Sequence, residues 1–578
     1  MNEPREQFAF AELDRQFARL LARLAGARNS PELEVAAKLA SWNRREGNIC
    51  VHLPSIAGTT WGDIALPPLE TWTKRLREAP VVGTPGEFTP LVLDAAGRLY
   101  LHRYWDYETR LATAIRQRAA SISGLAVDES KATELLRRLF PDELPGETNW
   151  QRIAAMTALS RRFCLISGGP GTGKTRTVVM LLALLLELAD ERPLRIALAA
   201  PTGKAAARLQ ESLRKLNGAL PCSDSVKSRL PEESFTLHRL LGSRPDSAFF
   251  KHHAANPLPF DVVIIDEASM VDLALMTKLV EAVPPNARLI LLGDRDQLAS
   301  VEAGSVLGDI CDAAQQARDL AGCVVQLEHN YRFGSRNGLL ALSRAVNAGD
   351  ASAAMELLSS AASGAAIASR PLPARSQLKA TLRDRVIAGF SPVLDATDAA
   401  SALAALARFR ILCALREGPF GVSGLNRFIE EILREAGKIL EQGPWYRGRP
   451  VMVTRNDYSL ELFNGDVGVL WPDPASGQPR AWFADATTGV RAVLPLRLPE
   501  HETAFAMTVH KSQGSEFAEV LLLLPDRASP VLSRELIYTG LTRASERAEV
   551  WFTEPVLRDA LARRATRTSG LRDQLGAP

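Results

Sequence analysis

The sequence of 578 residues is poor in cysteine and contains no long apolar run. Six cysteines, none of them in a C-x-x-C pair, exclude a disulfide-rich scaffold. The longest apolar stretch, residues 178–189, contains Glu187 and is too short to cross a bilayer. The first residues are polar and lack the apolar core of a signal peptide. We therefore expect a soluble, cytoplasmic protein without a membrane segment.

The charge is nearly balanced, with 69 Lys and Arg against 66 Asp and Glu and a net charge of +3. Bulk charge therefore does not indicate a nucleic-acid partner, and a protein of this composition must gather its basic residues locally to bind one. Hydrophobic residues make up 46% and charged residues 23%, which excludes a disordered or coiled-coil chain. At about 150 residues per domain, the length predicts several structural units.

Apolar periodicity divides the chain. Residues 1–115 begin with helical spacing and predict a mainly helical N-terminal domain. Residues 116–335 contain short apolar runs separated by amphipathic helices, the pattern of a parallel sheet buried on both faces. These runs are residues 163–167, 195–200, 262–266 and 289–293.

A second sheet domain is predicted in two parts, residues 336–440 and residues 501–578. Residues 441–500 differ in composition, being rich in Gly, Pro and Trp. They predict a small β-barrel inserted between these parts. The expected fold class is therefore α/β, with two parallel-sheet domains, a mainly helical N-terminal domain and a small β insertion.

Residues 168–175 match the phosphate-loop pattern G-x-x-x-x-G-K-[ST], between an expected strand and an apolar helix. The backbone N–H groups of such a loop wrap a polyphosphate, and the helix N-terminus adds a favourable partial charge. Lys174 is expected to reach the β- and γ-phosphates of ATP, and Thr175 to hold Mg²⁺. The expected nucleotide-binding loop is Gly168, Gly169, Pro170, Gly171, Thr172, Gly173, Lys174 and Thr175.

An acidic pair, Asp266 and Glu267, ends the apolar run that begins at Val262. The carboxyl end of a buried strand lies beside the phosphate loop in this type of domain. We expect Asp266 to bind Mg²⁺ and Glu267 to polarise the attacking water. These residues predict an NTPase without saying what hydrolysis drives.

Further motifs follow in an order that resembles superfamily 1 helicases. They occupy residues 149–152, 200–208, 236–242, 293–298, 327–333, 508–514 and 538–544. The resemblance implies two RecA-like P-loop NTPase domains and assigns roles residue by residue. Gln151 would pair with adenine and Tyr331 would stack on it; Gln297 would sense the γ-phosphate. Arg332 and Arg543 would be arginine fingers that stabilise transition-state charge.

Four further positions resemble strand-contacting residues of these helicases, namely Thr202, His238, Thr508 and His510. Contacts of this kind run along the backbone of a single strand. Thr and His also serve as helix caps and buried polar groups, so this second interpretation stays open for each position. Residues 243–260 could form a short hairpin that splits a duplex.

Within superfamily 1 the sequence is most similar to the RecD family, the α subunits of RecBCD (exodeoxyribonuclease V). Residues 47–54, 90–105 and 411–426 carry this resemblance outside the ATPase motifs. It implies a 5′→3′ DNA helicase that uses ATP and Mg²⁺, acts on single-stranded and duplex-end DNA, and contains an SH3-like insertion. It also implies RecB-like and RecC-like partners, with residues 1–115 as the docking domain and the nuclease in the RecB-like subunit.

Two alternatives remain. One is a stand-alone RecD-like 5′→3′ helicase, although residues 1–115 leave little room for the helix-hairpin-helix repeats of that kind. The other is an assembly subunit whose ATPase has decayed, which the complete set of ATPase residues disfavours.

Overall fold

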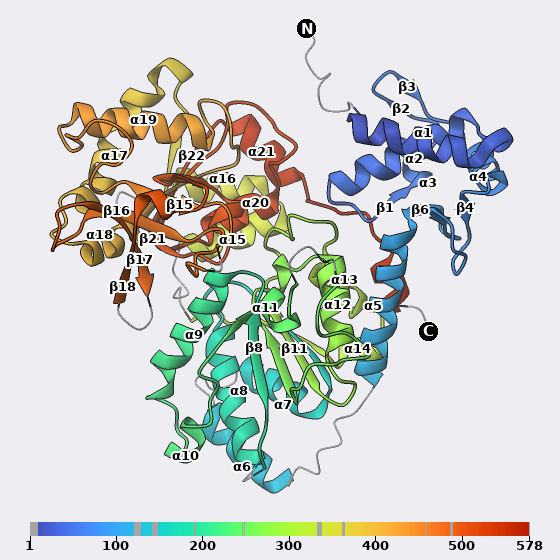
Figure 1. Cartoon of the computed structure of the whole chain (residues 1–578), viewed down its shortest axis with the longest axis horizontal. Helices are drawn as coiled ribbons and strands as arrows, with labels where there is room; N and C mark the ends of the chain where they lie inside the picture. The colour runs from blue at the N-terminus through green and yellow to red at the C-terminus, as the bar shows by residue number, and fades with distance from the viewer. Residues whose placement is uncertain are drawn as a thin grey trace.

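Hydrogen-bonded sheets organise the chain in the computed structural model (Figure 1). The structure describes residues 10–120, 129–141, 148–189, 192–244, 247, 249–331, 338–360, 365–457, 459–485 and 489–576. Two parallel sheets lie next to each other, and a separate N-terminal domain lies at one end of the molecule.

The first parallel sheet has the strand order β12-β7-β11-β10-β8-β9, and all its printed pairings are parallel. Its four central strands are the four apolar runs expected from the sequence. The bounds are β7 Phe163–Gly168, β8 Ile196–Ala200, β9 Phe235–Thr236, β10 Val262–Ile265, β11 Arg288–Gly293 and β12 Val324–Leu327.

Alternate side chains of these strands enter two separate cores, which is why the runs are apolar throughout. One core lies under α6 (Glu129–Leu139), α7 (Trp150–Ser160), α8 (Lys174–Leu188) and α9 (Gly203–Asn217). The opposite core lies under α5 (His102–Ala120), α11 (Leu237–Leu241), α12 (Leu273–Ala282), α13 (Val306–Ala313) and α14 (Arg318–Ala321).

The second parallel sheet has the order β13-β22-β21-β14-β20. Its strands come from both predicted parts of the chain: β13 Ile367–Pro371, β14 Phe409–Cys413, β20 Ala506–Thr508, β21 Phe517–Leu523 and β22 Ala544–Phe552. Helices cover both of its faces. One face carries α15 (Gly338–Ala348), α16 (Ala351–Ser359), α20 (Arg534–Leu541) and α21 (Glu554–Ala562); the other carries α17 (Leu378–Leu394) and α19 (Val422–Glu435).

An antiparallel sheet of order β18-β17-β16-β15-β19 is inserted between β14 and β20. Its strands are β15 Pro450–Val453, β16 Val467–Pro472, β17 Pro479–Asp485, β18 Gly489–Val493 and β19 His501–Thr503. The last of these strands lies just beyond the expected end of the insertion at residue 500. Helix α18 (Ala399–Leu406) packs against its Val469 and Trp471.

The N-terminal domain combines helices with a small sheet. Its helices are α1 (Glu12–Ala25), α2 (Pro31–Arg45) and α4 (Leu69–Glu78). Its sheet has the order β1-β6-β5-β4, formed by β1 Cys50–His52, β4 Val82–Gly83, β5 Leu91–Leu93 and β6 Arg98–Leu101. Helical periodicity alone did not indicate this sheet. Trp72 is fully buried in the core of this domain.

Helix α5 joins the N-terminal domain to the first parallel-sheet domain. The expected domain limit at residue 115 falls inside this helix, and its Leu111, Ile115 and Ala119 lie in the same core as α12 and α13. The expected fold class, α/β with two RecA-like parallel-sheet domains, is confirmed.

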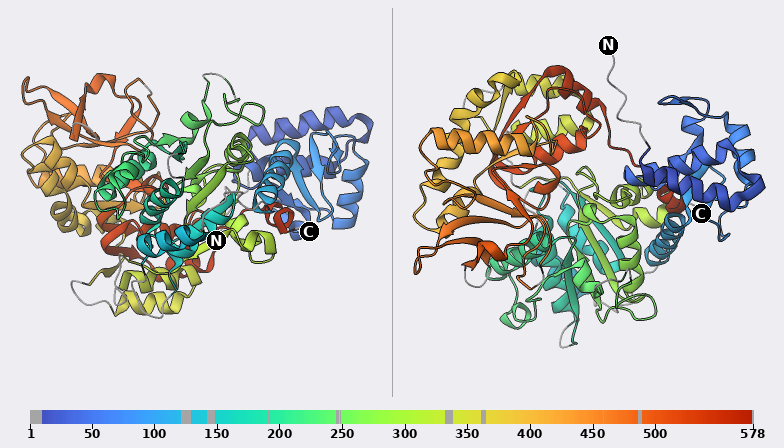
Figure 2. Two further views of the ribbon diagram at one scale, coloured as in Figure 1. Left: turned by 90° about the horizontal axis from the view of Figure 1, so that it is seen from below. Right: turned by 45° about the horizontal axis from the view of Figure 1, so that its top comes forward.

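The last residues of the chain leave the second sheet domain, to which the sequence had assigned them. Helix α22 (Leu571–Gly576) contributes Leu571 and Leu575 to the core that contains α5 and α13. Figure 2 shows the C-terminus returning to the side of the N-terminal domain. We call residues 566–576 and their contacts with the N-terminal and first sheet domains the C-terminal joint.

Candidate functional site

The phosphate-loop residues connect β7 to α8 at the carboxyl edge of the first parallel sheet. Gly171 and Gly173 have φ values of 80° and 82°, a left-handed conformation that glycine adopts without strain. A Cβ on Gly173 would also lie 2.3 Å from Gln151 Nε2, so the loop has no room for a larger residue there. This backbone requirement explains the glycines of the motif.

Lys174 is the first residue of α8, and its ammonium group turns back over the loop. Its Nζ donates to the carbonyl oxygen of Gly168 at 2.5 Å and to that of Gly169 at 3.1 Å. Thr175 follows it on the first turn of α8, and both residues line the same cavity. A cation and a helix N-terminus at one point favour a bound anion.

The acidic pair lies where the sequence predicts, directly after β10. The carboxylate of Asp266 accepts a hydrogen bond from the N–H of Glu267 at 2.8 Å. Burial and the neighbouring charge of Glu267 raise the pKa of Asp266. Glu267 has φ 52° in the left-handed region, a costly conformation for a residue other than glycine. Backbone strain of this kind clusters at functional sites, and here it falls on the expected water-polarising residue.

Gln297 follows β11 and faces the second sheet domain. Its amide donates to Asp294 Oδ2 at 3.1 Å, and Tyr538 of α20 donates to the same carboxylate oxygen at 2.9 Å. Gln297 Oε1 is buried and has no hydrogen-bond partner among the described residues. An unsatisfied buried acceptor is costly, so this oxygen is suited to accept a hydrogen bond from a bound water.

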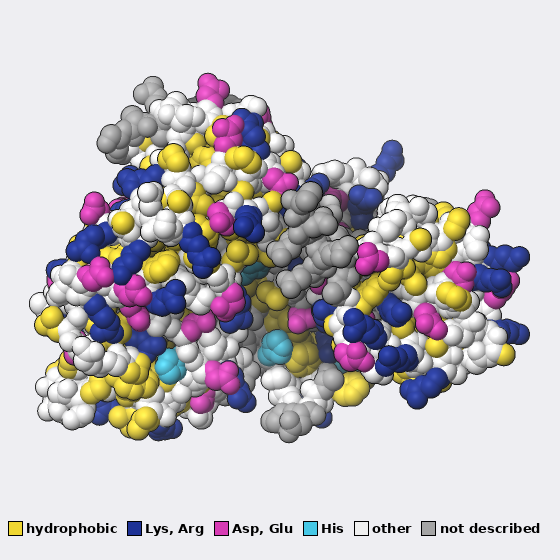
Figure 3. All heavy atoms as spheres, turned by 90° about the horizontal axis from the view of Figure 1, so that it is seen from above, with side chains coloured by type: hydrophobic (Ala, Val, Ile, Leu, Met, Phe, Trp, Pro, Cys, Tyr) yellow, Lys and Arg dark blue, Asp and Glu magenta, His cyan; other side chains and the backbone are white. Residues whose placement is uncertain are grey.

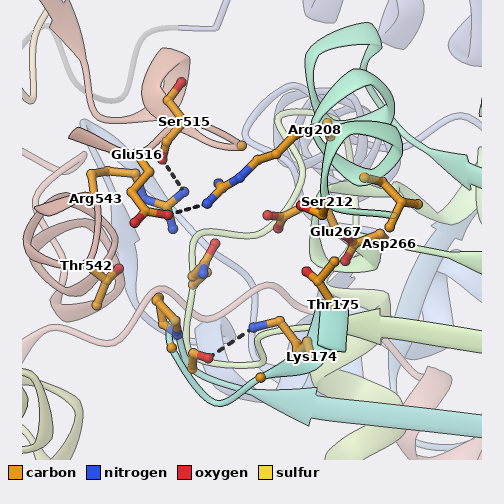
Figure 4. A pocket seen from close by; sticks show the side chains of 18 of the residues that line it. Lys174, Thr175, Arg208, Ser212, Asp266, Glu267, Ser515, Glu516, Thr542 and Arg543 are labelled. Carbon is orange, nitrogen blue, oxygen red and sulfur yellow. Dashed lines mark hydrogen bonds and ion pairs between the residues drawn. The ribbon is translucent and has the colours of Figure 1, made fainter. Parts of the chain in front are cut away.

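The opposite wall of the cavity comes from the second sheet domain (Figure 4). Arg543 follows α20 and is buried, with its Nη1 donating to the carbonyl of Ser515 at 3.2 Å and its Nε to that of Thr539 at 3.2 Å. Burial lowers the pKa of Arg543. Glu516, next to Ser515, forms an ion pair across the cavity with Arg208 of α9.

Gln151 and Tyr331 flank the phosphate loop. Gln151 Nε2 donates to the carbonyl of Thr172 at 3.4 Å, and the N–H of Tyr331 donates to that of Gly171 at 2.8 Å. Tyr331 is 42% exposed, and its ring has an edge contact with His329. The other expected finger, Arg332, lies outside the described residues.

Most of the predicted ATP-site residues thus meet in one cavity of about 360 Å³ between the two parallel sheets. The residues that line it are Gly169, Pro170, Gly171, Gly173, Lys174, Thr175, Arg176, Ala205, Arg208, Leu209, Ser212, Asp266, Glu267, Gln297, Tyr331, Gly514, Ser515, Glu516, Thr542 and Arg543. The basic side chains that line the cavity suit a bound triphosphate. The carboxylate pair beside the phosphate loop suits a divalent cation.

Comparisons with known proteins match the chain end to end. A profile described as "RecBCD enzyme subunit RecD, N-terminal domain" matches residues 6–100, an AAA domain matches 151–303, and a UvrD-like helicase C-terminal domain matches 503–550. RecBCD enzyme subunit RecD of Mycolicibacterium smegmatis is 42% identical over 98% of this chain and 98% of its own length. The chain belongs to the RecD family.

Other relatives agree with this family. The RecD subunit of Haemophilus influenzae is 35% identical over 93% of this chain and 92% of its own length. The ATP-dependent RecD2 DNA helicase of Deinococcus radiodurans is 30% identical over 78% of this chain, but over only 54% of its own length. The Pif1 helicase from Bacteroides in complex with ADP-AlF3 and ssDNA covers 72% of this chain at 16% identity, with a TM-score of 0.37. The two RecD relatives confirm the family resemblance stated from the sequence.

The expected strand-contacting residues also lie at caps or in buried positions within the chain itself. Thr202 caps α9 by accepting from the N–H of Ala205 at 3.2 Å, and Thr508 Oγ1 accepts from the N–H of Lys511 at 3.2 Å. His238 lies in α11 against the ring of Phe250. Burial lowers the pKa of His238, as it does for His510.

The inserted sheet touches two of the expected strand-contacting segments. Lys511 Nζ donates to Asn464 Oδ1 of the insertion at 2.7 Å. A Cβ added to Gly203 would lie 2.5 Å from the ring of Phe463, so α9 begins directly against the same insertion loop. The structure thus brings the Thr202 and Thr508 segments together beside the insertion.

Several residues of the cavity were not identified from the sequence, among them Arg208, Ser212, Ser515, Glu516 and Thr542. The signal was present for three of them, since Arg208 ends the motif at 200–208, Thr542 lies within the motif at 538–544, and Glu516 follows the motif at 508–514 by two positions. The motifs do not show which residue of the other sheet domain each side chain contacts. Only the arrangement of the two sheets shows this.

Within the described parts of the chain, the site included, no group of three or more His, Cys, Asp or Glu side chains is arranged to hold a metal ion. No helix within the same parts is long and apolar enough to cross a membrane.

Proposed function

We propose that this chain is an ATP-dependent DNA helicase that acts as the RecD subunit of a RecBCD enzyme. The observation that carries the proposal is the cavity between the two parallel sheets, in which one domain supplies Lys174 and Glu267 and the other supplies Arg543. End-to-end similarity to RecD subunits supports the same conclusion. A site completed by two domains suits a motor, because nucleotide binding and release can then move the domains relative to each other.

The chemistry follows from the positions of the side chains. Lys174 would leave the loop carbonyls for the β- and γ-phosphates of ATP, while Thr175 and Asp266 would hold Mg²⁺, which neutralises phosphate charge. Glu267 would take a proton from the attacking water, oriented by Gln297 Oε1. Arg543 would stabilise the charge that develops on the γ-phosphate, so Arg543→Ala should slow turnover by about 10³-fold.

The direction of movement is proposed as 5′→3′ along single-stranded DNA, on the basis of the family resemblance. Strand displacement on substrates with either a 5′ or a 3′ overhang tests it. Unwinding that needs the 5′ overhang supports the proposal, and unwinding that needs only the 3′ overhang contradicts it. The purified chain should also show ATPase activity stimulated by single-stranded DNA, without degrading the DNA.

RecB-like and RecC-like subunits are the proposed partners, with the nuclease in the RecB-like subunit. Helix α1 offers a docking surface, since Leu13, Leu20 and Leu24 are 69%, 44% and 57% exposed. These residues are spaced seven and four apart, so they lie on one side of the helix. Figure 3 shows hydrophobic side chains along this upper face of the N-terminal domain, at the right. An exposed apolar stripe of this kind is typical of an interaction surface.

Replacing all three leucines with Gln should prevent co-purification with the partner subunits while ATP binding is retained. Lys38→Gln on α2 is a matched control outside the stripe. The stand-alone helicase is the competing function, but its relative matches this chain over only about half of its own length. Native mass measurement separates the two, because a free monomer would favour the stand-alone enzyme.

A further inference from the structure

Two basic side chains of α9 reach across the cleft to a single loop of the second sheet domain. Lys204 and Arg208 are four residues apart and therefore lie on the same side of the helix. Lys204 Nζ donates to Ser515 Oγ at 2.5 Å, and Arg208 forms its ion pair with Glu516. We call residues 514–516 the clasp loop.

The clasp loop also holds the finger residue Arg543. The Nη1 group of Arg543 donates to the carbonyl of Ser515, and its Nε donates to the carbonyl of Thr539 in α20. No carboxylate of a described residue lies within ion-pair distance of this guanidinium, so two carbonyl oxygens fix its direction. One of these carbonyls belongs to the loop that Arg208 contacts from the other domain (Figure 4). Lys204 contacts the same loop at Ser515.

Removing the Lys204 ammonium group from water costs free energy that its contacts must offset. Burial, together with the nearby positive charges of Arg410, Arg208 and Arg543, lowers the pKa of Lys204 to about 8. A buried ammonium group loses hydration free energy that its partners must offset. Here Asp466 of the insertion is the nearby opposite charge, and Ser515 Oγ accepts the hydrogen bond.

The same helix begins at a residue expected to contact DNA. Thr202 caps α9, two residues before Lys204 and six before Arg208. A single helix therefore connects the proposed strand-contacting end with both contacts to the clasp loop. Because a helix of 15 residues moves as one body, a strand bound at Thr202 would fix the position of Lys204 and Arg208 as well.

We propose that Lys204 and Arg208 are positioning residues that place Arg543 through the clasp loop, and that this contact lets bound single-stranded DNA stimulate ATP hydrolysis. The inference rests on the proposed helicase function and adds to it a route between the two sites. ATP hydrolysis needs the finger at the γ-phosphate, and the clasp loop brings it there when the two sheet domains close.

The test measures kcat and KM for ATP, with and without single-stranded DNA, in Arg208→Gln, Glu516→Gln and Lys204→Gln. Each variant should lower the ratio of stimulated to unstimulated kcat by about 10-fold, with a smaller change in KM, since the lost contact orients a group that acts in the transition state. Lys215→Gln is the matched control, because it breaks an exposed pair with Glu211 on the same helix. Its ratio should stay unchanged.

Two combined variants separate positioning from a purely structural role. Arg208→Glu with Glu516→Arg restores the pair with its charges exchanged and should recover most of the stimulation. Arg208→Gln combined with Arg543→Ala should be no slower than Arg543→Ala alone, because both changes remove the same action of the finger.

The inference is overturned if Arg208→Gln retains full stimulation, if its effect adds to that of Arg543→Ala, or if it changes only the melting temperature. Failure of the proposed function gives a different result. In that case the unmodified chain itself shows no stimulation by DNA, and the inference falls with it.

Discussion

Two of the contacts between the domains of this chain differ in chemistry. At the cleft, Arg208 and Glu516 form an ion pair whose side chains are 42% and 25% exposed. At the C-terminal joint, the Glu108 carboxyl group is fully buried and accepts hydrogen bonds from the N–H of Gly570 at 3.0 Å, from Gln574 Nε2 at 3.0 Å and from Tyr100 OH at 3.1 Å.

The difference indicates which contact can open. Exposed ion pairs contribute about 0–1 kcal/mol each, so they can form and break during a catalytic cycle. Separation of the joint would leave buried donors and a carboxylate without partners, at a cost of about 1–3 kcal/mol per group. We therefore expect the N-terminal domain to move together with the first sheet domain, while the second sheet domain moves against both.

The joint also reaches towards the nucleotide cavity. Arg567 donates to the carbonyl oxygens of Ser300 at 2.5 Å and Gly304 at 3.0 Å, in the segment that follows Gln297. The N–H of Ile49 donates to the carbonyl of Thr568 at 2.8 Å. The tail of the second sheet domain thus ties this segment to the N-terminal domain, which is the domain proposed to face the partner subunits.

The largest expected effect is at the cleft. Lys174→Gln should abolish ATP hydrolysis, because the amide cannot supply the positive charge that the phosphates require. Its melting temperature should stay close to that of the unmodified chain, since Lys174 contacts loop carbonyls rather than the core. Steady-state ATPase assays and thermal unfolding measure both quantities. Normal turnover by this variant would remove the assignment of the site.

The next effect is at the joint, where we expect a loss of stability with little change in ATP hydrolysis. Glu108→Ala should destabilise the N-terminal domain by about 3 kcal/mol, because it leaves the donors of Gly570, Gln574 and Tyr100 buried without their acceptor. Hydrogen exchange at residues 49–52 and 98–101 measures the loss, and turnover should change little.

Glu302→Ala is the matched control for this change, since the side chain of Glu302 is 62% exposed and pairs with Arg44. Its effect should stay within about 0.5 kcal/mol. Equal effects of the two substitutions would contradict the distinction between a buried hydrogen-bonded contact and an exposed ion pair.

The sequence predicted the cleft much better than the joint, for physical reasons. Phosphate binding requires glycines, a lysine and carboxylates at fixed spacing, so Gly173, Lys174 and Asp266 can be recognised from local pattern alone. The joint depends on contacts between residues far apart in the sequence, such as Glu108 and Gly570, and the Gly570 donor is a main-chain N–H that leaves no mark in the sequence. No local pattern marks such a contact, and residues 501–578 were therefore assigned to one domain.

The smallest effect concerns how the stability of the joint depends on pH. Burial raises the pKa of Glu108 from 4.5 to about 8, and the neighbouring Asp309 has its pKa raised by burial to about 7. Between pH 4.5 and 8 the folded Glu108 carboxyl keeps a proton that the unfolded chain has lost. The folded state then binds more protons, so the stability of the joint falls as pH rises through this window.

Glu108→Gln removes this titration but keeps an acceptor for Gly570. The joint of this variant should lose less stability than the unmodified joint between pH 6 and pH 8.5, by about 2–3 kcal/mol at the upper end. The groups that face Glu108 and remain are Tyr100, Arg98 and Asp309, and of these Asp309 titrates in the same direction. Part of the pH dependence should therefore survive in the variant.

The measurement is hydrogen exchange at the amides of Ile49 and Gly570, corrected for the intrinsic rise of the exchange rate with pH. The amide of Gly570 donates to Glu108 directly, whereas that of Ile49 donates to Thr568 two residues earlier in the tail. If the joint opens as one unit, both amides should report the same opening free energy and the same change in the variant. A change confined to Gly570 would mean that Glu108 affects only its own hydrogen bond, and the joint would then be a set of independent contacts rather than one unit.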